Sequence, residues 1–543
     1  MRRLLWIPWR WWRRAVQLAL LVGFLWLFRR TEYSGADQLG GGENLLFRLD
    51  PLAGASAMLA GRKLILLCWP ALIVLGLTLV FGRFFCGWVC PLGTLLDGFH
   101  RLIRPVARRT NRLPQWRFMA PVMKRVRLTR YVLLVLVLVA AAFALPLVGF
   151  VDPFSLLVRG LTFWGDPSLY RGADAMFTWT ADRWGTESVR LYITKHLLPY
   201  RQTLYQTAAA SAIILGVIFA LELVARRFWC RYLCPLGAGL GLLARPSLVR
   251  RLPVKVCGAC GNCAGACRMG ALDRSAGFSP EACNLCMECV DTCPHRIAKF
   301  GLKRPKTPPA PVDLSRRGLL AAAVSGVVLP GIVKAARLGR AGPTDPHLLR
   351  PPGAADERTF LGLCVRCGEC MKVCPTNVLQ PAVFQAGVEG MFSPRLLPRV
   401  IFEQSYCEYN CTLCGQACPT GAIPRLAVEE KHKHPTGKAY FDHALCLPWA
   451  KETSCIRCEE MCPTPDKAIK IRNTFKVAGA NGEEVEIMQP YVDRDLCVGC
   501  GICESNCPIE GAAGIRVRRV DAPDPRTEFK DPPATRPALT QPA

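Results

Sequence analysis

The stretch CVRCGECMKVCP, residues 364–375, places four cysteines at the spacing C-x2-C-x2-C-x3-C and ends in proline. The chain has 543 residues and 29 cysteines, and 24 of these cysteines form six groups of this kind. Four groups keep the same spacing and five end in Cys-Pro. The six groups are Cys257, Cys260, Cys263 and Cys267; Cys283, Cys286, Cys289 and Cys293; Cys364, Cys367, Cys370 and Cys374; Cys407, Cys411, Cys414 and Cys418; Cys446, Cys455, Cys458 and Cys462; and Cys497, Cys500, Cys503 and Cys507.

This spacing is that of the bacterial ferredoxin run, in which three close thiolates hold one [4Fe–4S] cluster and the fourth reaches a neighbouring cluster. Zinc sites favour isolated C-x2-C pairs, and disulfides would not fix such short spacings. We therefore predict six [4Fe–4S] clusters in α+β ferredoxin-type domains. In the first two groups, crossing over assigns Cys267 to the cluster of the second group and Cys293 to that of the first. The last four groups allow either sequential or nested pairing, where nested pairing joins the first with the fourth and the second with the third.

Two groups depart from the pattern. Arg268 replaces the proline after Cys267, so the chain should leave that cluster differently. Cys446 stands well before Cys455, which predicts a looser and more exposed corner for its cluster.

The first part of the chain is basic and rich in apolar runs. Residues 1–340 carry 46 Lys and Arg against 16 Asp and Glu, whereas residues 341–543 carry 23 against 25. Runs of nearly membrane-spanning length occur at about 15–28, 64–81, 131–150 and 207–225. The basic segment 82–130 would stay in the cytoplasm. We expect an α-helical membrane domain of four spans in a bacterial inner membrane, with a cytoplasmic N-terminus, contacts to membrane lipids and no nucleic-acid partner.

A fifth apolar run, residues 318–333, follows Ser315-Arg316-Arg317 and resembles a twin-arginine export signal. It predicts one further single span, retained or cleaved, and a periplasmic C-terminal domain; a buried or amphipathic helix is the alternative. The expected domains are the membrane domain (1–250), a cytoplasmic two-cluster ferredoxin domain (251–305), a proline-rich linker with the export-like segment (306–345), a four-cluster domain (346–520) and a disordered tail (521–543).

Two related stretches, RFFCGWVCPLG (83–93) and RFWCRYLCPLG (227–237), contain the motif C-x3-C-P. If each helix continues through the motif, its two cysteines are i, i+4 neighbours on one face and the proline ends the helix. Together Cys86, Cys90, Cys230 and Cys234 could hold an extra cluster or a soft metal such as copper(I), or act as redox thiols. The alternative is two separate pairs of packed, reduced cysteines.

Other polar and thiol residues have more ordinary interpretations. Glu222 lies in the fourth apolar run and could accept a proton from quinol, or could simply reach the interface. Cys68 is expected in the core. His432, His434 and His443 are expected in a solvated loop.

The two C-x3-C-P motifs followed by two ferredoxin runs resemble the NapH/MauN family of quinol-oxidising membrane ferredoxins over residues 1–305. Residues 315–520 resemble the NapG/MauM family, so the chain looks like a fusion of both. The resemblance implies an electron-transfer component of a quinol-oxidising respiratory system, with quinol as substrate. Its partner would be a periplasmic reductase of the nitrate or nitrous oxide type, or the cytochrome subunit of that reductase. A maturation or copper-handling factor is the main alternative, and a redox sensor is a weaker one.

Overall fold

The computed structural model describes the chain except residues 1–7, 34, 41, 43, 111–125, 185–186, 189–191, 193–202, 253–259, 273–276, 303–315, 339–344, 400–404, 479–483 and 523–543. The chain divides into two compact units. Unit 1 comprises residues 1–339, 354–394 and 412–425, and unit 2 comprises residues 340–353, 395–411 and 426–543. The predicted proline-rich linker and disordered tail fall largely outside the described residues.

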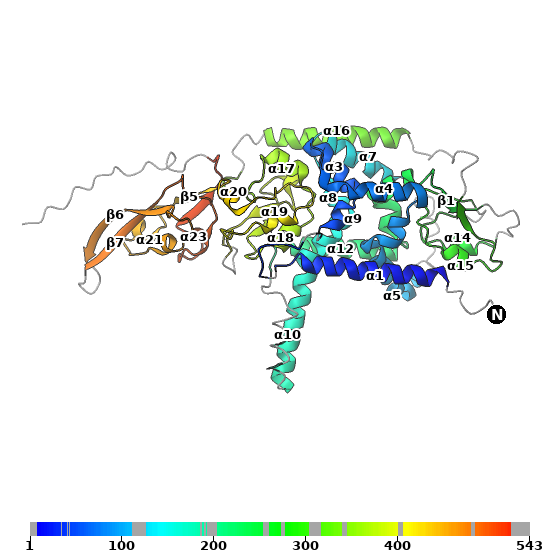
Figure 1. The fold of residues 1–543 in the computed structure, drawn as a ribbon, viewed down its shortest axis with the longest axis horizontal. Helices are drawn as coiled ribbons and strands as arrows, with labels where there is room; N and C mark the ends of the chain where they lie inside the picture. Colours follow the sequence, from blue (N-terminus) through cyan, green and yellow to red (C-terminus); the bar gives the residue numbers. More distant parts are fainter. Residues whose placement is uncertain are drawn as a thin grey trace, which may run out of the picture. The chain divides into compact units, whose positions relative to one another are not determined.

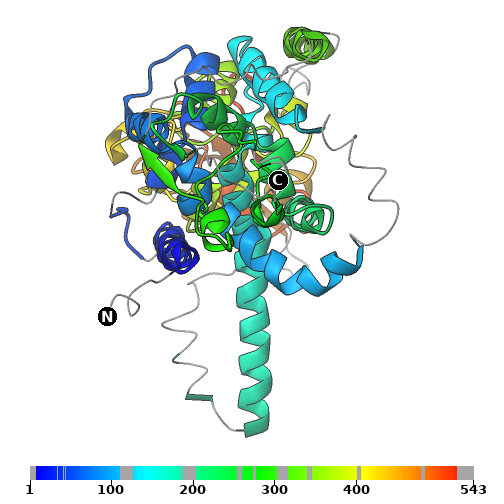
Figure 2. The same cartoon turned by 90° about the vertical axis from the view of Figure 1, so that its right-hand side faces the viewer.

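Unit 1 is mainly helical (Figure 1). Its helices are α1 (Trp9–Arg30), α2 (Leu45–Arg48), α3 (Pro51–Gly61), α4 (Pro70–Phe81), α5 (Pro91–Thr110), α7 (Thr129–Ala142), α8 (Val148–Val151), α9 (Pro153–Gly160), α10 (Asp166–Trp184), α12 (Ala208–Ala220), α13 (Pro235–Leu243), α14 (Asn262–Ala266), α15 (Glu288–Asp291), α16 (Arg316–Leu338), α17 (Glu357–Leu363), α18 (Glu369–Lys372) and α19 (Leu413–Ala417). Helix α10 projects away from the other helices of unit 1 in both views (Figure 2).

The centre of unit 1 forms around α7, against which α3, α13 and α16 pack. The inward face of α7 carries small and branched apolar residues, and Val137 and Ala140 are almost fully buried. A glycine on α16 lets its backbone come close to α7, because a Cβ at Gly326 would lie 2.9 Å from the Cβ of Val139. These contacts hold α16 along the outside of α7 (Figure 1).

The predicted membrane spans are wrong. Within the described residues, no helix combines the length and the apolar character that a membrane crossing requires. The expected α-helical membrane domain of four spans plus one further single span is therefore overturned. So is the predicted inner-membrane location with its cytoplasmic N-terminus and periplasmic C-terminal domain, because that location depended on the spans.

The apolar runs fail as spans because the chain breaks them. Helices α4, α7 and α12 have 12, 14 and 13 residues. At 1.5 Å per residue they reach about 18–21 Å, against about 30 Å for a hydrocarbon core. Pro70 starts α4 partway through the second run, and α12 gives way to a short 3-10 turn. In α1 the side chains of Arg13 and Gln17 are buried within the protein.

Short strands complete the ferredoxin-type part of unit 1. Strands β1 (Val249–Arg251) and β2 (Phe300–Leu302) pair in antiparallel register, with Arg250 opposite Gly301. They bracket the chain segment that carries the first two cysteine groups, with α14 and α15 between them. Strand β3 (Leu379–Pro381) follows the third group. This confirms the ferredoxin-type part of the expected fold.

Unit 2 combines two antiparallel strand pairs with short helices (Figure 1). Its elements are α20 (Val428–His432), β5 (Lys438–Phe441), α21 (Leu447–Ala450), α22 (Arg457–Glu460), β6 (Ile469–Ala478), β7 (Glu484–Val492), α23 (Ile502–Ser505) and β8 (Ile515–Arg518), and β4 (Pro394–Leu396) lies at the boundary between the units. Strand β5 pairs with β8, and Ala439 and Val517 are buried opposite each other. Alternating apolar residues thus cover the cysteine-bearing loops.

Candidate metal centres

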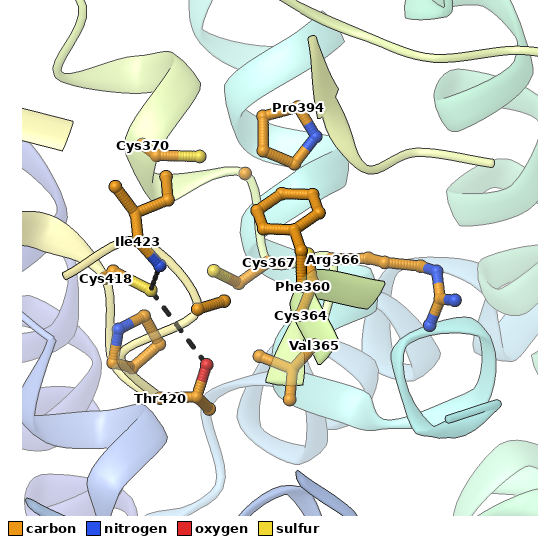
Figure 3. A pocket seen from close by; sticks show the side chains of 13 residues that line it. Phe360, Cys364, Val365, Arg366, Cys367, Cys370, Pro394, Cys418, Thr420 and Ile423 are labelled. Atoms are coloured by element: carbon orange, nitrogen blue, oxygen red, sulfur yellow. Dashed lines mark hydrogen bonds between the residues drawn. The ribbon is translucent and has the colours of Figure 1, made fainter. Parts of the chain in front are cut away.

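One cavity of unit 1 is lined by cysteines from two groups (Figure 3). Cys364, Cys367 and Cys370 come from one group and Cys418 is the last cysteine of the next, around about 350 Å³ of empty space. Figure 3 shows the sulfur atoms of Cys367, Cys370 and Cys418 turned toward the same space. Gly368 has φ of 90° just before α18, a conformation that favours glycine and lets the run curl around the cavity. This is the three-plus-one arrangement of a ferredoxin cluster.

Unit 2 repeats the arrangement twice. Cys446, Cys455 and Cys458 line one cavity with Cys507, the last cysteine of the following group. The other cavity is lined by Cys497, Cys500, Cys503 and Cys462. The two cavities contain about 320 and 350 Å³ of empty space.

These cavities favour sequential pairing over nested pairing. The third group shares a cavity with a cysteine of the fourth group, and the fifth and sixth groups exchange their last cysteines. The remaining set, Cys374, Cys407, Cys411 and Cys414, has members in both units and stays a prediction. Cys446 is only 7% exposed, so the exposed corner expected there is not found.

The cysteines of the first two groups lie near one another. Burial raises the pKa of Cys289 to about 12, and the charges of Cys286, Cys267 and Cys263 act in the same direction, so these thiols lie near one another. The pKa of Cys283 is likewise raised by burial and then by Cys286, Cys289 and Cys267. Cys263, which crossing over assigns to the other cluster, is also near Cys289, so the assignment of Cys267 to the second cluster stays a prediction. Of the other set, Cys257 lies outside the described residues, and Cys260, Cys263 and Cys293 lie within them.

The donor groups fit iron–sulfur clusters. Backbone N–H groups point at several of the sulfurs: Ala271 donates to Cys267 at 3.2 Å, Ile423 to Cys418 at 3.4 Å and Gly514 to Cys507 at 3.4 Å. Such bonds stabilise thiolates and tune cluster potentials. Among the described residues, no three His, Cys, Asp or Glu side chains are gathered closely enough for one metal ion.

The two C-x3-C-P motifs adopt one shared geometry that differs from the predicted helix. Each forms a π-turn, Phe85–Val89 and Trp229–Leu233, closed by a bond of 2.9 Å from the second cysteine's N–H to the carbonyl five residues earlier. Pro91 and Pro235 then begin α5 and α13 instead of ending a helix, as proline can at a first helical position. Single π-turns often occur at functional sites.

Cys86, Cys90, Cys230 and Cys234, here called the four-cysteine centre, converge in the core of unit 1. Each is 5–8% exposed. Burial raises the pKa of Cys234, and the charges of Cys230, Cys86 and Cys90 raise it further, which requires all four thiols to be near neighbours. The alternative of two separate pairs is therefore not what the structure shows.

The two C-x3-C-P repeats contact each other through an arginine and a glycine in each repeat. These residues were not predicted as part of the site from the sequence. Arg83 and Arg227 hold equivalent positions in the repeats, as do Gly93 and Gly237. A Cβ at Gly93 would lie 3.2 Å from Nη1 of Arg227, and one at Gly237 would lie 2.6 Å from Nη2 of Arg83. Each arginine thus crosses to the Cys-Pro-Leu-Gly segment of the other repeat. The repetition of Arg and Gly in both stretches was the available signal.

Asp97 anchors a buried ion network beside the four-cysteine centre. Its carboxylate accepts two bonds from Arg227, at 3.0 and 2.7 Å, and also pairs with Arg268 and Arg13. Burial by itself would raise the pKa of Asp97, but the charges of Arg227 and Arg268 hold it well below its usual range. Arg268 also pairs with Glu288. The arginine after Cys267, which departs from the ferredoxin pattern, therefore ties that loop to the four-cysteine centre.

Glu222 is buried in the same region. Its Oε2 accepts the N–H of Arg227 at 2.9 Å and lies 3.5 Å from Nδ1 of His100. These contacts position the turn that leads to Cys230. Its predicted role as a proton acceptor stays a prediction. Cys68 is buried against Gly54, as expected of a core cysteine.

Further residues near the cysteines had only weak sequence signals. Three groups end in Cys-Pro-Thr, and each threonine hydroxyl lies near the sulfur, closest at 3.2 Å between Thr464 and Cys462. Buried Lys431 donates to the carbonyl oxygens of Glu408, Tyr409 and Cys411. His432 was expected in a solvated loop but stacks on Tyr409 with 3.9 Å between ring centroids.

Paired cysteine groups around shared cavities define a ferredoxin-type iron–sulfur protein. A family model described as a 4Fe-4S dicluster domain matches residues 363–422 and 425–511, which agrees with sequential pairing. Another, described as a 4Fe-4S binding domain, matches residues 64–110 and 207–255, the segments of the two C-x3-C-P motifs.

The relatives specify the family. The methylamine utilization ferredoxin-type protein MauM of Methylorubrum extorquens is 37% identical over 222 residues, 40% of this chain and 91% of the relative. The ferredoxin-type protein NapG of Haemophilus influenzae is 33% identical over 32% of this chain and 59% of the relative, and NapF of Escherichia coli is 30% identical over 30% and 80%. No solved structure matches. The chain belongs to the MauM/NapG family of ferredoxin-type proteins.

Proposed function

We propose that this protein carries electrons through six [4Fe–4S] clusters toward a periplasmic reductase of the nitrate or nitrous oxide type. The electrons would derive from quinol. The proposal also treats residues 1–305 as the counterpart of a NapH/MauN-type partner that is fused to the MauM/NapG-like part. Each cluster would gain and lose one electron, and the protein's residues set its potential through burial and hydrogen bonds.

The observation that carries the proposal is the closeness of neighbouring cavities in unit 2. Cys458 lines one cavity and Cys462, four residues later, lines the other. The same holds for Cys507 and Cys503. Helices α22 and α23, which carry these segments, pack against each other. Two redox centres joined by two short segments are arranged for electron exchange.

The test uses the full chain purified without oxygen. We expect at least about 24 iron atoms per chain, the content of six four-iron clusters. A quinol analogue should reduce the clusters, and a purified periplasmic nitrate reductase with its cytochrome subunit should reoxidise them.

Cys458→Ala should interrupt reoxidation, whereas Cys68→Ala should not, because Cys68 lines none of these cavities. Zinc or cystine in place of iron would refute the proposal. Stoichiometric copper with no electron delivery would favour the copper-handling alternative.

A further inference from the structure

The four-cysteine centre lies beside the cluster site of the second cysteine group. The side-chain N–H of Trp88, within the first π-turn, donates to the carbonyl of Leu285 at 3.0 Å. Arg83 donates to the carbonyl of Glu281 at 3.0 Å. A Cβ at Gly87 would lie 2.1 Å from the carbonyl oxygen of Asn284. The loop that bears Cys283 and Cys286 therefore rests directly on the turn that bears Cys86.

On its other side, the centre connects through α9 to the cavity of Figure 3. Phe85, next to Cys86, packs on Phe154 of α9 with ring centroids 5.9 Å apart. Farther along, Arg159 of α9 lies close enough to Cys367 for their charges to interact. One continuous buried core includes the four cysteines, Phe154 and Cys367. All these residues belong to unit 1.

The charges around the centre require a negative counterpart. Arg227 is neutralised by Asp97, whereas Arg83 is fully buried and pairs with no carboxylate in the described part of the chain. Its Nε and Nη2 have no hydrogen-bond partner there, and Nη2 lies at the edge of the centre beside Gly237 and Cys234. An uncompensated buried cation destabilises a fold by several kcal/mol. Neutral thiols would leave Arg83 uncompensated, while thiolates held by a metal cluster would balance it.

From this geometry we propose that the four-cysteine centre holds a seventh iron–sulfur cluster, which relays electrons between the clusters on its two sides. The inference rests on the proposed electron-carrying function. In each step the seventh cluster would take one electron from the cluster on one side and pass it to the cluster on the other side. No bond forms or breaks. A four-iron cube takes one thiolate at each of its four corners, which matches the four cysteines of this centre.

The experiment compares iron and labile sulfide in the anaerobic full chain, in Cys86→Ala/Cys230→Ala and in Cys68→Ala. We expect about 28 iron atoms per chain in the parent and in Cys68→Ala, and about 24 in the double variant. In the reduced parent, spin coupling to the seventh cluster should broaden the electron paramagnetic resonance signal of the neighbouring cluster. That broadening should disappear in the double variant.

The outcomes separate the two proposals. A count of about 24 in all three proteins, or copper or zinc lost with the two cysteines, would overturn the seventh cluster and leave the six-cluster function standing. A parent count far below 24 would instead refute the proposed function. If the double variant fails to fold, Arg83→Gln and Arg83→Lys decide the question. The loss of positive charge in Arg83→Gln should lower the potential of one cluster only, and Arg83→Lys should restore it; unchanged potentials in both would contradict the inference.

Discussion

Replacing Asp97 by asparagine should destabilise unit 1 strongly. The side chains of Arg13, Arg227 and Arg268 are 0–1% exposed, and Asp97 is their shared anion. Asparagine has nearly the same shape but no charge, and its amide N–H groups would face guanidinium N–H groups. The variant therefore tests charge compensation with little change in packing volume.

The expected loss follows from the distances. Asp97 lies 2.7 Å from Arg227 and 3.9 Å from Arg13. A unit-charge pair at about 4 Å contributes roughly 4 kcal/mol at an effective dielectric constant of 20, before desolvation is counted. Breaking one partner of a buried pair typically costs about 3–5 kcal/mol, and we expect Asp97→Asn to fall in that range.

The assay is urea unfolding under anaerobic conditions, followed by the loss of visible cluster absorbance. With m near 3 kcal/mol per M, a loss of this size lowers the midpoint by about 1 M or more. Asp493→Asn is the matched control, because Asp493 pairs with Lys470 at 3.0 Å on the exposed surface of unit 2. It should leave the midpoint unchanged. If Asp97→Asn and the parent unfolded at the same urea concentration, the negative charge of Asp97 would not be needed to compensate the three buried arginines, and the reasoning would be refuted.

Four further predictions test separate features. Gly87→Ala places a Cβ 2.1 Å from the carbonyl oxygen of Asn284 and should cost about 1–3 kcal/mol in thermal unfolding, while Gly98→Ala, with nothing within 4 Å, should not destabilise; equal losses would count against this contact. Cys418→Ala should remove the same paramagnetic signal as Cys367→Ala, whereas nested pairing requires Cys507→Ala to do so. Thr464→Val should lower one cluster potential by about 40 mV, the equivalent of roughly 1 kcal/mol, and Thr464→Ser should not; equal potentials would exclude a bond to Cys462. Burial raises the pKa values of both Asp50 and Asp152, and the charge of Asp152 together with the hydrogen bond between the two carboxyl groups raises that of Asp50 further. The folded state therefore binds more protons, and stability should fall as pH rises above about 3.9, the ordinary aspartate pKa. Asp50→Asn, which can still cap α3, should flatten that fall; an unchanged pH profile would show that the pair does not titrate as inferred.

The cysteine groups made the cluster sites predictable because ligand spacing is local. The run from Cys364 to Cys374 encodes its own loop, so the three-plus-one pattern followed from sequence. Pairing between groups did not follow, since it depends on which segments the fold brings together. Arg268 stands where the other five groups have proline, but this departure from the pattern could not reveal that its side chain would reach Asp97.

The apolar runs misled the prediction for a physical reason. Hydropathy counts apolar residues in a window, but it does not show that Pro70 restarts a helix or that Gln17 donates to the carbonyl of Gly87 inside the protein. The prediction that the C-x3-C-P motifs continue an α-helix failed for a similar reason. A π-turn has one residue more than an α-helical turn, and the cysteine spacing alone does not distinguish the two.

The packing of α16 along α7 has a consequence for how the N-terminal helices are connected to the segment that follows α16. The segment that leads to the cysteine group beginning at Cys364 is anchored, through Gly326 and Val139, on the helical body that holds the C-x3-C-P turns. The similarity to MauM covers 91% of that protein but only 40% of this chain, so this chain carries a large additional part. When two modules are joined in one chain, they no longer have to meet by diffusion. With a short linker, each experiences the other at an effective concentration in the millimolar range. Under the proposed function, donor and acceptor modules joined in this way would stay engaged at any dilution, and their contact surface would not need to hold free partners together.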